Sequence, residues 1–351
     1  MQVVTLADLR TMKAVVFQEP NRLVVEDKPV PEVGEHDALV RVHACGVCGT
    51  DLHIFKGEHI VKFPVIPGHE FSGEVVEIGA KVTNVGVGDP VTIDPNIVDW
   101  TCFFCRRGEI NLCENLTAVG VNFDGGFAEY CRVPAVQAYK VPGSVSLDEA
   151  AFAEPLACCI HGMDRADVVS GSTVVILGAG SIGLMMVQLA RIAGARHIIV
   201  SEPDEAKRKL AARMGSDVQI DPLSRDPVSE VGKITGVGAD VVIESAGRLE
   251  TAELALKLAR RGGTVLQFGV VSPDELAKVS PYDVYYREVT IRGSFVNPFT
   301  HARAVDLLAS KQIDVMPLVT RRFGLDDAAK ALEAAADKDT IKILLAPEQV
   351  S

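Results

Sequence analysis

The chain has 351 residues, enough for about two domains of ordinary size, and its 48% of apolar residues can fill a core in each. A formal net charge of −12 and an isoelectric point near 5.2 argue against nucleic acid or an anionic membrane surface as a partner. No apolar run is long enough to span a bilayer, so we expect no membrane association.

The start of the chain, Met1 to Arg10, contains an acidic residue and no apolar core segment, so we expect no signal peptide. A first strand is expected from Lys13, which makes Met12 a candidate natural start and residues 1–11 a candidate extension. Eight cysteines without a secretion signal indicate metal binding rather than a disulfide scaffold. We therefore expect a cytoplasmic protein.

Residues 12–160 have the pattern of a β-rich domain. Short apolar runs at 39–42, 73–78 and 90–93 are separated by Gly, Pro, Asn and Asp, which favour turns. Three segments between these runs carry potential metal ligands: Cys45 to His53, Pro67 to Glu70, and Glu154 to Ala157.

Thiolate, imidazole and carboxylate groups all bind zinc, and a catalytic zinc keeps one position open for water or substrate. Each segment has another interpretation when it is taken alone. Cys45 with Cys48 fits a redox pair, and His69 fits a hydrogen-bonded core residue. Glu154 fits an acid at a helix start. Taken together, the three segments favour a metal site.

Residues 172–295 alternate between strand and helix patterns, which predicts a parallel sheet built from βαβ units. The expected strands are 173–177, 197–201, 240–244, 263–268 and 289–294, and the expected helices are 181–193, 204–214 and 250–261.

The first of these strands leads into a glycine-rich turn. Thr173 to Gly183 reads TVVILGAGSIG, so Gly178, Gly180 and Gly183 have G-x-G-x-x-G spacing. The first glycine permits a tight turn, the second lets the backbone approach a pyrophosphate, and the third allows close packing of helix on strand. The following helix would present its free N–H groups to the phosphates. Alone, this pattern also fits an ordinary strand-to-helix turn.

An acidic residue at the end of the second strand favours the dinucleotide interpretation. Glu202 lies 19 residues beyond Gly183, close to the roughly 20 at which an acid binds the adenosine ribose hydroxyls and repels a 2′-phosphate. Glu202 therefore predicts NAD. Lys207 and Arg208 leave open a phosphate-binding alternative, and both also fit a solvated helix face.

The last part of the chain has helical patterns at 302–310 and 325–336 and a closing strand at 340–345. We expect it to fold back onto the first domain, so that the nucleotide-binding domain is an insertion.

From about Lys13 to Leu345 the chain resembles the zinc-dependent medium-chain alcohol dehydrogenases, in the branch of the polyol (sorbitol-like) and threonine dehydrogenases. The segments that carry the resemblance are CGTD-LH at 48–53, GHE at 68–70, a cysteine-rich lobe at 102–113, EPLA at 154–157, GAGSIG at 178–183, GSF at 293–295 and LASKQIDVMPLVTRRF at 308–323.

The resemblance implies an α/β fold with three segments. These are a β-rich, GroES-like catalytic domain at 1–160, a Rossmann domain with a doubly wound parallel sheet at 161–296, and a C-terminal segment at 297–351 that returns to the catalytic domain.

The resemblance also implies roles around a catalytic zinc. Cys48 is the thiolate ligand and His69 the imidazole ligand, whereas Cys45 packs nearby. Glu70 and Glu154 are the two carboxylates, and the sequence leaves open which touches the metal and which acts through water. Thr50 occupies a hydroxyl position, and His53 that of a proton-relay histidine.

The family commonly holds a structural zinc with four lobe cysteines. Here the four positions are Asp99, Cys102, Cys105 and Cys113. Aspartate is a zinc ligand, so a closed tetrahedral site is expected. The alternative is a lobe that has lost its metal and keeps three packed thiols.

The remaining cofactor positions are also implied by the resemblance. Ser181 and Ile182 lie within the glycine turn, Lys207 near the adenosine ribose, and Gly269, Val270, Ser294 and Phe295 near the nicotinamide. Phe295 equally fits a core aromatic at a strand end.

The predicted enzyme uses zinc and NAD to oxidise a secondary alcohol, with a polyol as substrate and a ketose as product. The alternatives are a threonine- or butanediol-type dehydrogenase and a non-catalytic, crystallin-like structural protein. The edge strand at 289–294 resembles the one across which relatives pair, so a homodimer or homotetramer is expected.

Overall fold

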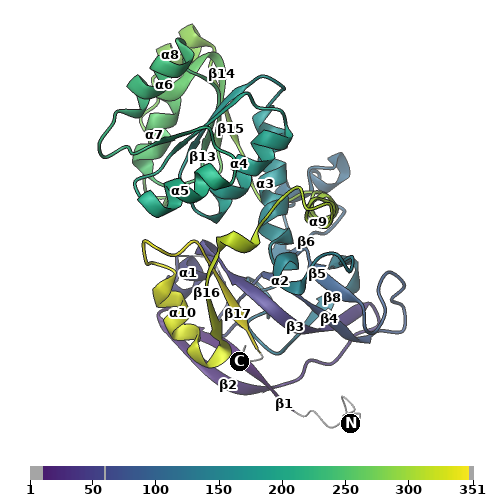
Figure 1. Cartoon of the computed structure of the whole chain (residues 1–351). Coiled ribbons are helices and arrows are strands. Elements are labelled where there is room, and N and C mark those ends of the chain that lie inside the picture. Colours follow the sequence, from purple (N-terminus) through teal and green to yellow (C-terminus); the bar gives the residue numbers. More distant parts are fainter. Residues whose placement is uncertain (1–10, 59–60, 348–351) are drawn as a thin grey trace. The chain divides into compact units, whose positions relative to one another are not determined.

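The computed structural model describes residues 11–58 and 61–347 (Figure 1). The expectation of no signal peptide at Met1 to Arg10 falls on residues outside this range. Contacts divide the chain into unit 1 (Met1–Pro155, Ala304–Ala309 and Val315–Ser351) and unit 2 (Leu156–Arg303 and Ser310–Asp314). Within the described part, no helix has the length and apolar character needed to cross a membrane.

Unit 1 is built on a seven-stranded sheet in the order β16-β17-β3-β4-β5-β9, with β8 pairing β3. The strands are β3 (Asp37–Val47), β4 (Glu70–Ile78), β5 (Pro90–Ile93), β8 (Tyr130–Pro134), β9 (Ala138–Lys140), β16 (Val319–Gly324) and β17 (Lys342–Ala346). Two-stranded pairs are formed by β1 (Thr11–Glu19) with β2 (Arg22–Pro29), and by β6 (Asn96–Ile97) with β7 (Thr117–Ala118). The helices of this unit are α1 (Gly49–Lys56), α2 (Leu147–Ala150) and α10 (Ala328–Ala334).

Unit 2 is built on a six-stranded parallel sheet in the order β12-β11-β10-β13-β14-β15, with helices on both sides (Figure 1). The strands are β10 (Thr173–Leu177), β11 (His197–Ser201), β12 (Val218–Ile220), β13 (Ala239–Glu244), β14 (Ala259–Gln267) and β15 (Thr290–Gly293). The helices are α4 (Ser181–Ile192), α5 (Glu205–Arg213), α6 (Pro227–Thr235), α7 (Leu249–Leu258) and α8 (Pro281–Arg287). Two further helices, α3 (Ala153–Ala166) and α9 (His301–Ala309), have residues in both units.

The strand order confirms the predicted doubly wound sheet. β10 pairs with β11 on one side and β13 on the other, so the chain reverses its direction of winding at β10. Ligands bind at such a switch point, beyond the carboxyl ends of the strands. The side chains from Val174 to Leu177 are fully buried, as an apolar strand covered on both faces requires.

The prediction missed two helices of unit 2, α6 and α8. Asp226 caps α6, because its carboxylate accepts hydrogen bonds from the N–H groups of Val228 and Ser229. Pro227 occupies the first turn, where its missing N–H costs nothing. The Asp-Pro pair was therefore a readable start signal. Helix α7 ends at Leu258 rather than the expected 261, since the chain enters β14 at Ala259.

Candidate active site: candidate zinc ligands and a glycine-rich turn

Three predicted zinc ligands lie together in unit 1. The ligand atoms of Cys48, His69 and Glu70 are all within 4.8 Å of one another. The register of two strands brings them together, because Gly46 of β3 lies opposite Glu70 of β4 in an antiparallel pair. Cys48 follows β3 directly and caps α1, so it emerges beside His69.

Asp51, to which the prediction gave no role, contacts two members of this cluster, Cys48 and His69. Its side chain is fully buried, and its Oδ2 accepts a hydrogen bond of 2.8 Å from the Cys48 N–H. Its Oδ1 lies 3.5 Å from His69 Nδ1. Burial lowers the pKa of His69, but Asp51 and Cys48 outweigh burial and hold that pKa well above its usual value. A carboxylate at Nδ1 orients the imidazole so that Nε2 is left for a metal. The Cys-x-x-Asp spacing was the available signal, because it allows a capping contact.

Lys342 was also missed. It lies at the start of β17, which pairs with β3, and its buried ammonium contacts Glu70 Oε2. Burial lowers the pKa of Lys342, but the charges of Glu70 and Cys48 outweigh it and raise that pKa. Gly46 leaves the room for this pair, since a Cβ there would be 2.3 Å from Glu70 Oε2. One oxygen of Glu70 is therefore held by a cation of this chain.

The three other predicted catalytic residues, Thr50, His53 and Glu154, are not members of this cluster. Thr50 Oγ1 is 3.8 Å from Cys48 Sγ. His53 lies further along α1, with its Nδ1 2.6 Å from Glu58 Oε2 at an exposed position. Glu154 is buried in the first turn of α3, but its carboxylate is not part of the group formed by Cys48, His69 and Glu70. Of the two candidate carboxylates, only Glu70 lies in the cluster.

Cys45 does not form a redox pair with Cys48. Both thiols are free, and the Cys45 side chain is completely buried in the core of unit 1. Burial raises the pKa of the Cys45 thiol well above its usual value. Its Sγ lies against Gly68, where an added Cβ would be 2.8 Å away. Cys45 is thus a packing residue.

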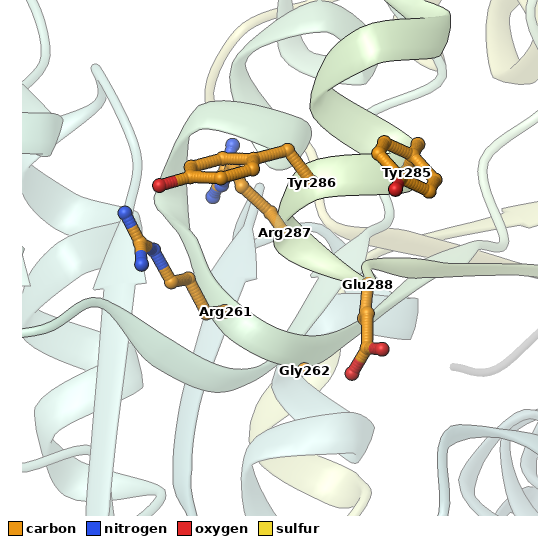
Figure 2. A pocket seen from close by; sticks show the side chains of 6 residues that line it. All are labelled: Arg261, Gly262, Tyr285, Tyr286, Arg287 and Glu288. Atoms are coloured by element: carbon orange, nitrogen blue, oxygen red, sulfur yellow. The ribbon is translucent and has the colours of Figure 1, made fainter.

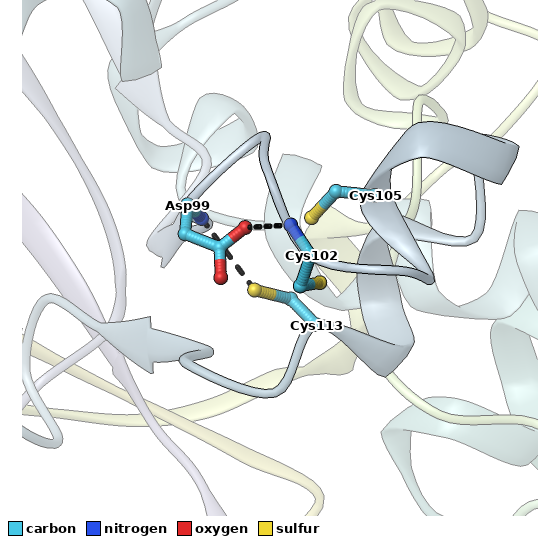
Figure 3. A group of neighbouring side chains, drawn as sticks. All are labelled: Asp99, Cys102, Cys105 and Cys113. Carbon is cyan, nitrogen blue, oxygen red and sulfur yellow. Dashed lines mark hydrogen bonds between the residues drawn. The ribbon is translucent and has the colours of Figure 1, made fainter.

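The lobe brings its four predicted ligands together (Figure 3). One ligand atom from each of Asp99, Cys102, Cys105 and Cys113 lies within 4.8 Å of the others. Two short 3-10 helices position the last two: η2 (Cys105–Arg107) begins at Cys105, and η3 (Ile110–Leu112) ends just before Cys113. The four donors suit a closed zinc site, with aspartate in the place of one thiolate.

Main-chain N–H groups stabilise the negative charge of the lobe. Asp99 Oδ1 accepts from the N–H groups of Thr101 and Cys102, at 2.7 and 2.9 Å. The Asn115 amide donates to Asp99 Oδ2, and Cys113 Sγ accepts from the N–H groups of Asp99 and Asn115. The hydrogen bond from the Cys102 N–H is the main reason why the pKa of Asp99 lies well below its usual value. The Asp99 carboxylate is therefore ionised, and available as a metal ligand, at any pH at which the neighbouring cysteines could bind a metal as thiolates.

In unit 2 the three glycines of the turn have three different environments. Gly178 has φ of +100°, which side chains rarely adopt. A Cβ on Gly183 would lie 2.1 Å from the Gly178 carbonyl oxygen, so the close packing of α4 on β10 requires glycine. A Cβ on Gly180 would meet nothing within 4 Å. This open space lies in front of the N-terminus of α4, whose first turn contains Ser181 and Ile182. A pyrophosphate could approach the main chain there.

Glu202 lies beside this turn and is buried. Its Oε2 accepts a 2.8 Å hydrogen bond from the Ala179 N–H, and its Oε1 accepts from the Asp204 N–H at 2.9 Å. Lys207 lies in the first turn of α5, where its N–H donates to the capping carboxylate of Asp204. Arg208 is half-buried rather than solvated: its guanidinium donates to the carbonyls of Glu202 and Pro203 and lies 3.7 Å from Asp221 Oδ2.

The expected nicotinamide segment also lies at the carboxyl ends of these strands. Gly269 and Val270 follow β14, and the Val270 side chain is 75% exposed. Ser294 follows β15, and its N–H donates to the Gln267 carbonyl. Phe295 is 55% exposed, so the alternative of a core aromatic is wrong.

A surface pocket in unit 2 contains none of the predicted residues (Figure 2). It has a volume of about 430 Å³ and is lined by Arg261, Gly262, Tyr285, Tyr286, Arg287 and Glu288. Its cations are already engaged, because the Arg261 guanidinium lies 4.9 Å from the centre of the Tyr286 ring and Arg287 donates to the Leu256 carbonyl. We assign no ligand to it.

Comparison with known proteins supports the resemblance over nearly the whole chain. Residues 34–143 match the alcohol dehydrogenase GroES-like domain, and residues 181–310 match the zinc-binding dehydrogenase domain. D-arabinitol dehydrogenase 1 of Uromyces fabae is 35% identical over 96% of this chain and 97% of its own length. L-threonine 3-dehydrogenase of Pyrococcus horikoshii is 36% identical, over 95% of this chain and 98% of its own.

A zinc-binding dehydrogenase from Sinorhizobium meliloti, solved with NADP, is 44% identical and superposes with a TM-score of 0.93. The match covers 96% of this chain and 99% of that one. The chain is a dehydrogenase and belongs to the zinc-dependent medium-chain alcohol dehydrogenase family.

Proposed function

We propose that the protein oxidises a secondary carbinol of a polyol to a ketose, with NAD as hydride acceptor. The observation that carries this proposal is the group of Cys48, His69 and Glu70, a donor set with one thiolate and one carboxylate beside the imidazole, in which His69 and Glu70 are buried and Cys48 is half-buried. The family's zinc would be held by Cys48 and His69, with Glu70 as the carboxylate of the cluster and Glu154 as the second carboxylate that the resemblance implies. When bound, zinc acts as a Lewis acid on the substrate oxygen.

The residues of this chain then supply positioning and proton transfer. Asp51 orients His69, and Lys342 holds Glu70. We assign the Thr50 hydroxyl the role of accepting the carbinol proton and passing it toward His53, whose Nδ1 is paired with Glu58 at the exposed end of α1.

NAD is favoured over NADP by the carboxylate of Glu202. It lies against the glycine turn, and Arg208 is already bound to main-chain carbonyls, so a 2′-phosphate would meet a negative charge without this cation. Lys207 lies in the first turn of α5, five residues after Glu202. The solved relative from Sinorhizobium meliloti contains NADP, so the ratio of kcat/KM for the two cofactors is the direct test.

A second copy of the chain is the partner that we propose. β15 is an edge strand of the sheet, and Ile291 on it is 47% exposed. The outer edge of a sheet can pair with another strand, which gives a dimer or, with a second contact, a tetramer. We place the reaction in the cytoplasm, a reducing compartment, with which eight free cysteines are compatible.

The substrate class is tested by steady-state rates on a panel of alcohols. Sorbitol, xylitol and arabinitol should be favoured over 2-propanol and 2-butanol, because a site that binds extra hydroxyls leaves its polar groups unpaired with simple alcohols. A preference for L-threonine would make the protein a threonine-type dehydrogenase, its neighbour within the same branch, which is also represented among its relatives. A preference for butanediol would make the protein a butanediol-type dehydrogenase instead. No turnover with any alcohol would support a structural, crystallin-like protein.

A further inference from the structure

Glu244 is a buried acid to which no step of the proposed reaction assigns a role. It is the last residue of β13 and lies beside the switch point at β10, and its side chain is fully buried. Within residues 11–58 and 61–347, no lysine, arginine or histidine forms an ion pair with it. A buried carboxylate is tolerated only when hydrogen bonds replace its water.

Four neutral donors surround this carboxylate. Oε1 accepts from the N–H groups of Ala246 and Gly247, at 2.9 and 3.0 Å, and from Thr251 Oγ1 of α7 at 2.7 Å. Oε2 accepts from Gln267 Nε2 at 2.8 Å. The two oxygens therefore have different partners: Oε1 holds the turn after β13, and Oε2 holds the end of β14.

The Oε1 side is connected to the glycine turn. Ser245, next to Glu244, donates from both its N–H and its hydroxyl to the Leu177 carbonyl, at 3.0 and 2.9 Å. The Ser245 hydroxyl also lies against Gly183, where an added Cβ would be 3.1 Å away. Movement of residues 245–247 would therefore disturb the turn that faces the pyrophosphate.

The Oε2 side is connected to the segment at 269–270. Gln267 Nε2, which donates to Glu244 Oε2, also donates to the Gly269 carbonyl at 2.8 Å. Gly269 packs so closely that a Cβ there would lie 2.5 Å from Glu244 Oε2 and 2.3 Å from the Gly247 nitrogen. The main-chain carbonyl of Glu244 accepts from the Gly269 N–H as well.

We propose that Glu244 is a positioning residue for the cofactor. One carboxylate holds the turn beside Gly178–Gly183 and, through Gln267, the segment at Gly269 and Val270, so that the pyrophosphate and nicotinamide sites keep a fixed separation. This inference rests on the proposed function, since it assumes that a nicotinamide dinucleotide occupies both sites.

The Glu244→Gln variant separates the two sides. Three donors face Oε1, so the amide oxygen will stay there and the new NH₂ group will face Gln267 Nε2, donor against donor. Either Gln267 loses its bond to residue 244, or its amide turns over and gives up its bond to the Gly269 carbonyl. The side-chain link to Gly269 therefore breaks, whereas the main-chain bond from the Gly269 N–H and the link to the glycine turn remain. We expect the Kd for NADH to rise about tenfold or more. The Kd for ADP-ribose, which lacks the nicotinamide, should change by less than about threefold.

Gln267→Leu breaks the same link from the other side and should reproduce this selective loss. Because both changes remove one connection, the double variant should be little worse than either single variant. Asp240→Asn is the matched control, on the same strand at its amino end. Its carboxylate accepts from the Thr173 N–H and from Arg260, away from the cofactor segments. It should lower the melting temperature without changing the ratio of the two dissociation constants.

Binding is measured by fluorescence titration of the purified full chain. The inference is overturned if Glu244→Gln binds NADH as tightly as the wild type does, or if it loses NADH and ADP-ribose to the same degree. If the wild type binds neither ligand, the proposed function itself fails. If the wild type binds both ligands and the variant shows no selective loss of NADH, the inference about Glu244 fails while the proposed function stands.

Discussion

The group of candidate zinc ligands in unit 1 and the glycine turn of unit 2 are built in opposite ways. The cluster is made of side chains from distant parts of the chain, because Lys342, which holds Glu70, comes 272 residues after it. The glycine turn is made of main chain within six consecutive residues, and its function depends on missing side chains. A substitution in the cluster should therefore change metal binding and the catalytic rate, whereas one in the turn should change the packing of the main chain and the binding of the cofactor.

The largest effect is expected in the cluster, from Cys48→Ser. A hydroxyl replaces the thiolate ligand, so zinc should be lost or weakly held and kcat/KM should fall by about a thousandfold or more. Cys45→Ser is the control, because Cys45 is a packed thiol outside the cluster, and its effect on activity should be mild. Full activity of Cys48→Ser after chelation would show that Cys48 is not the ligand, and an essential Cys45 would show that the cluster is wrongly aligned.

Two alanine substitutions test whether the turn acts through shape. Gly183→Ala places a Cβ 2.1 Å from the Gly178 carbonyl oxygen, so it should lower stability by about 1–3 kcal/mol as well as weaken NADH binding. Gly180→Ala meets nothing within 4 Å, so its melting temperature should stay near that of the wild type while NADH binding weakens about tenfold or more. Normal NADH binding by Gly180→Ala would contradict the assignment of Gly180 to the pyrophosphate site.

Lys342→Met tests the long-range part of the cluster. It leaves the Glu70 carboxylate buried without its cation, and breaking a buried ion pair from one side costs about 3–5 kcal/mol of unfolding free energy. Lys13→Met is the matched control, since Lys13 pairs with Asp326 at the surface and should matter little. Urea denaturation measures both. Equal stabilities of the two variants would mean that Lys342 does not hold Glu70 in solution.

The smallest of these effects is expected from Glu202→Ala. Loss of the carboxylate should weaken NAD use and shift the NAD-to-NADP ratio of kcat/KM by about tenfold toward NADP, since the charge that repels a 2′-phosphate is gone. A wild type that already prefers NADP would contradict the assignment and would point to Lys207 as the dominant group.

The same contrast explains what could be predicted from sequence. The glycine turn, the parallel sheet and the lobe were predicted because their signals are local: six consecutive residues, repeated strand–helix alternation, and four ligand residues within positions 99–113. Asp51 and Lys342 were missed because their roles depend on strand register and burial. Arg208 was misjudged for the same reason, since a charged residue on a helix gives no sign that it turns back to bind carbonyls.

The measurement that tests the central claim most directly is the zinc content per chain of the wild type, Cys48→Ser and Cys113→Ser, with activity measured on the same samples. The account predicts about two zinc ions in the wild type and about one in each variant, with activity lost in Cys48→Ser and largely kept in Cys113→Ser, because a closed lobe site has no open position for substrate. A single zinc in the wild type, unaffected by Cys113→Ser, would make Asp99 the mark of an abandoned lobe site. A Cys48→Ser protein with full zinc content and full activity would contradict the account.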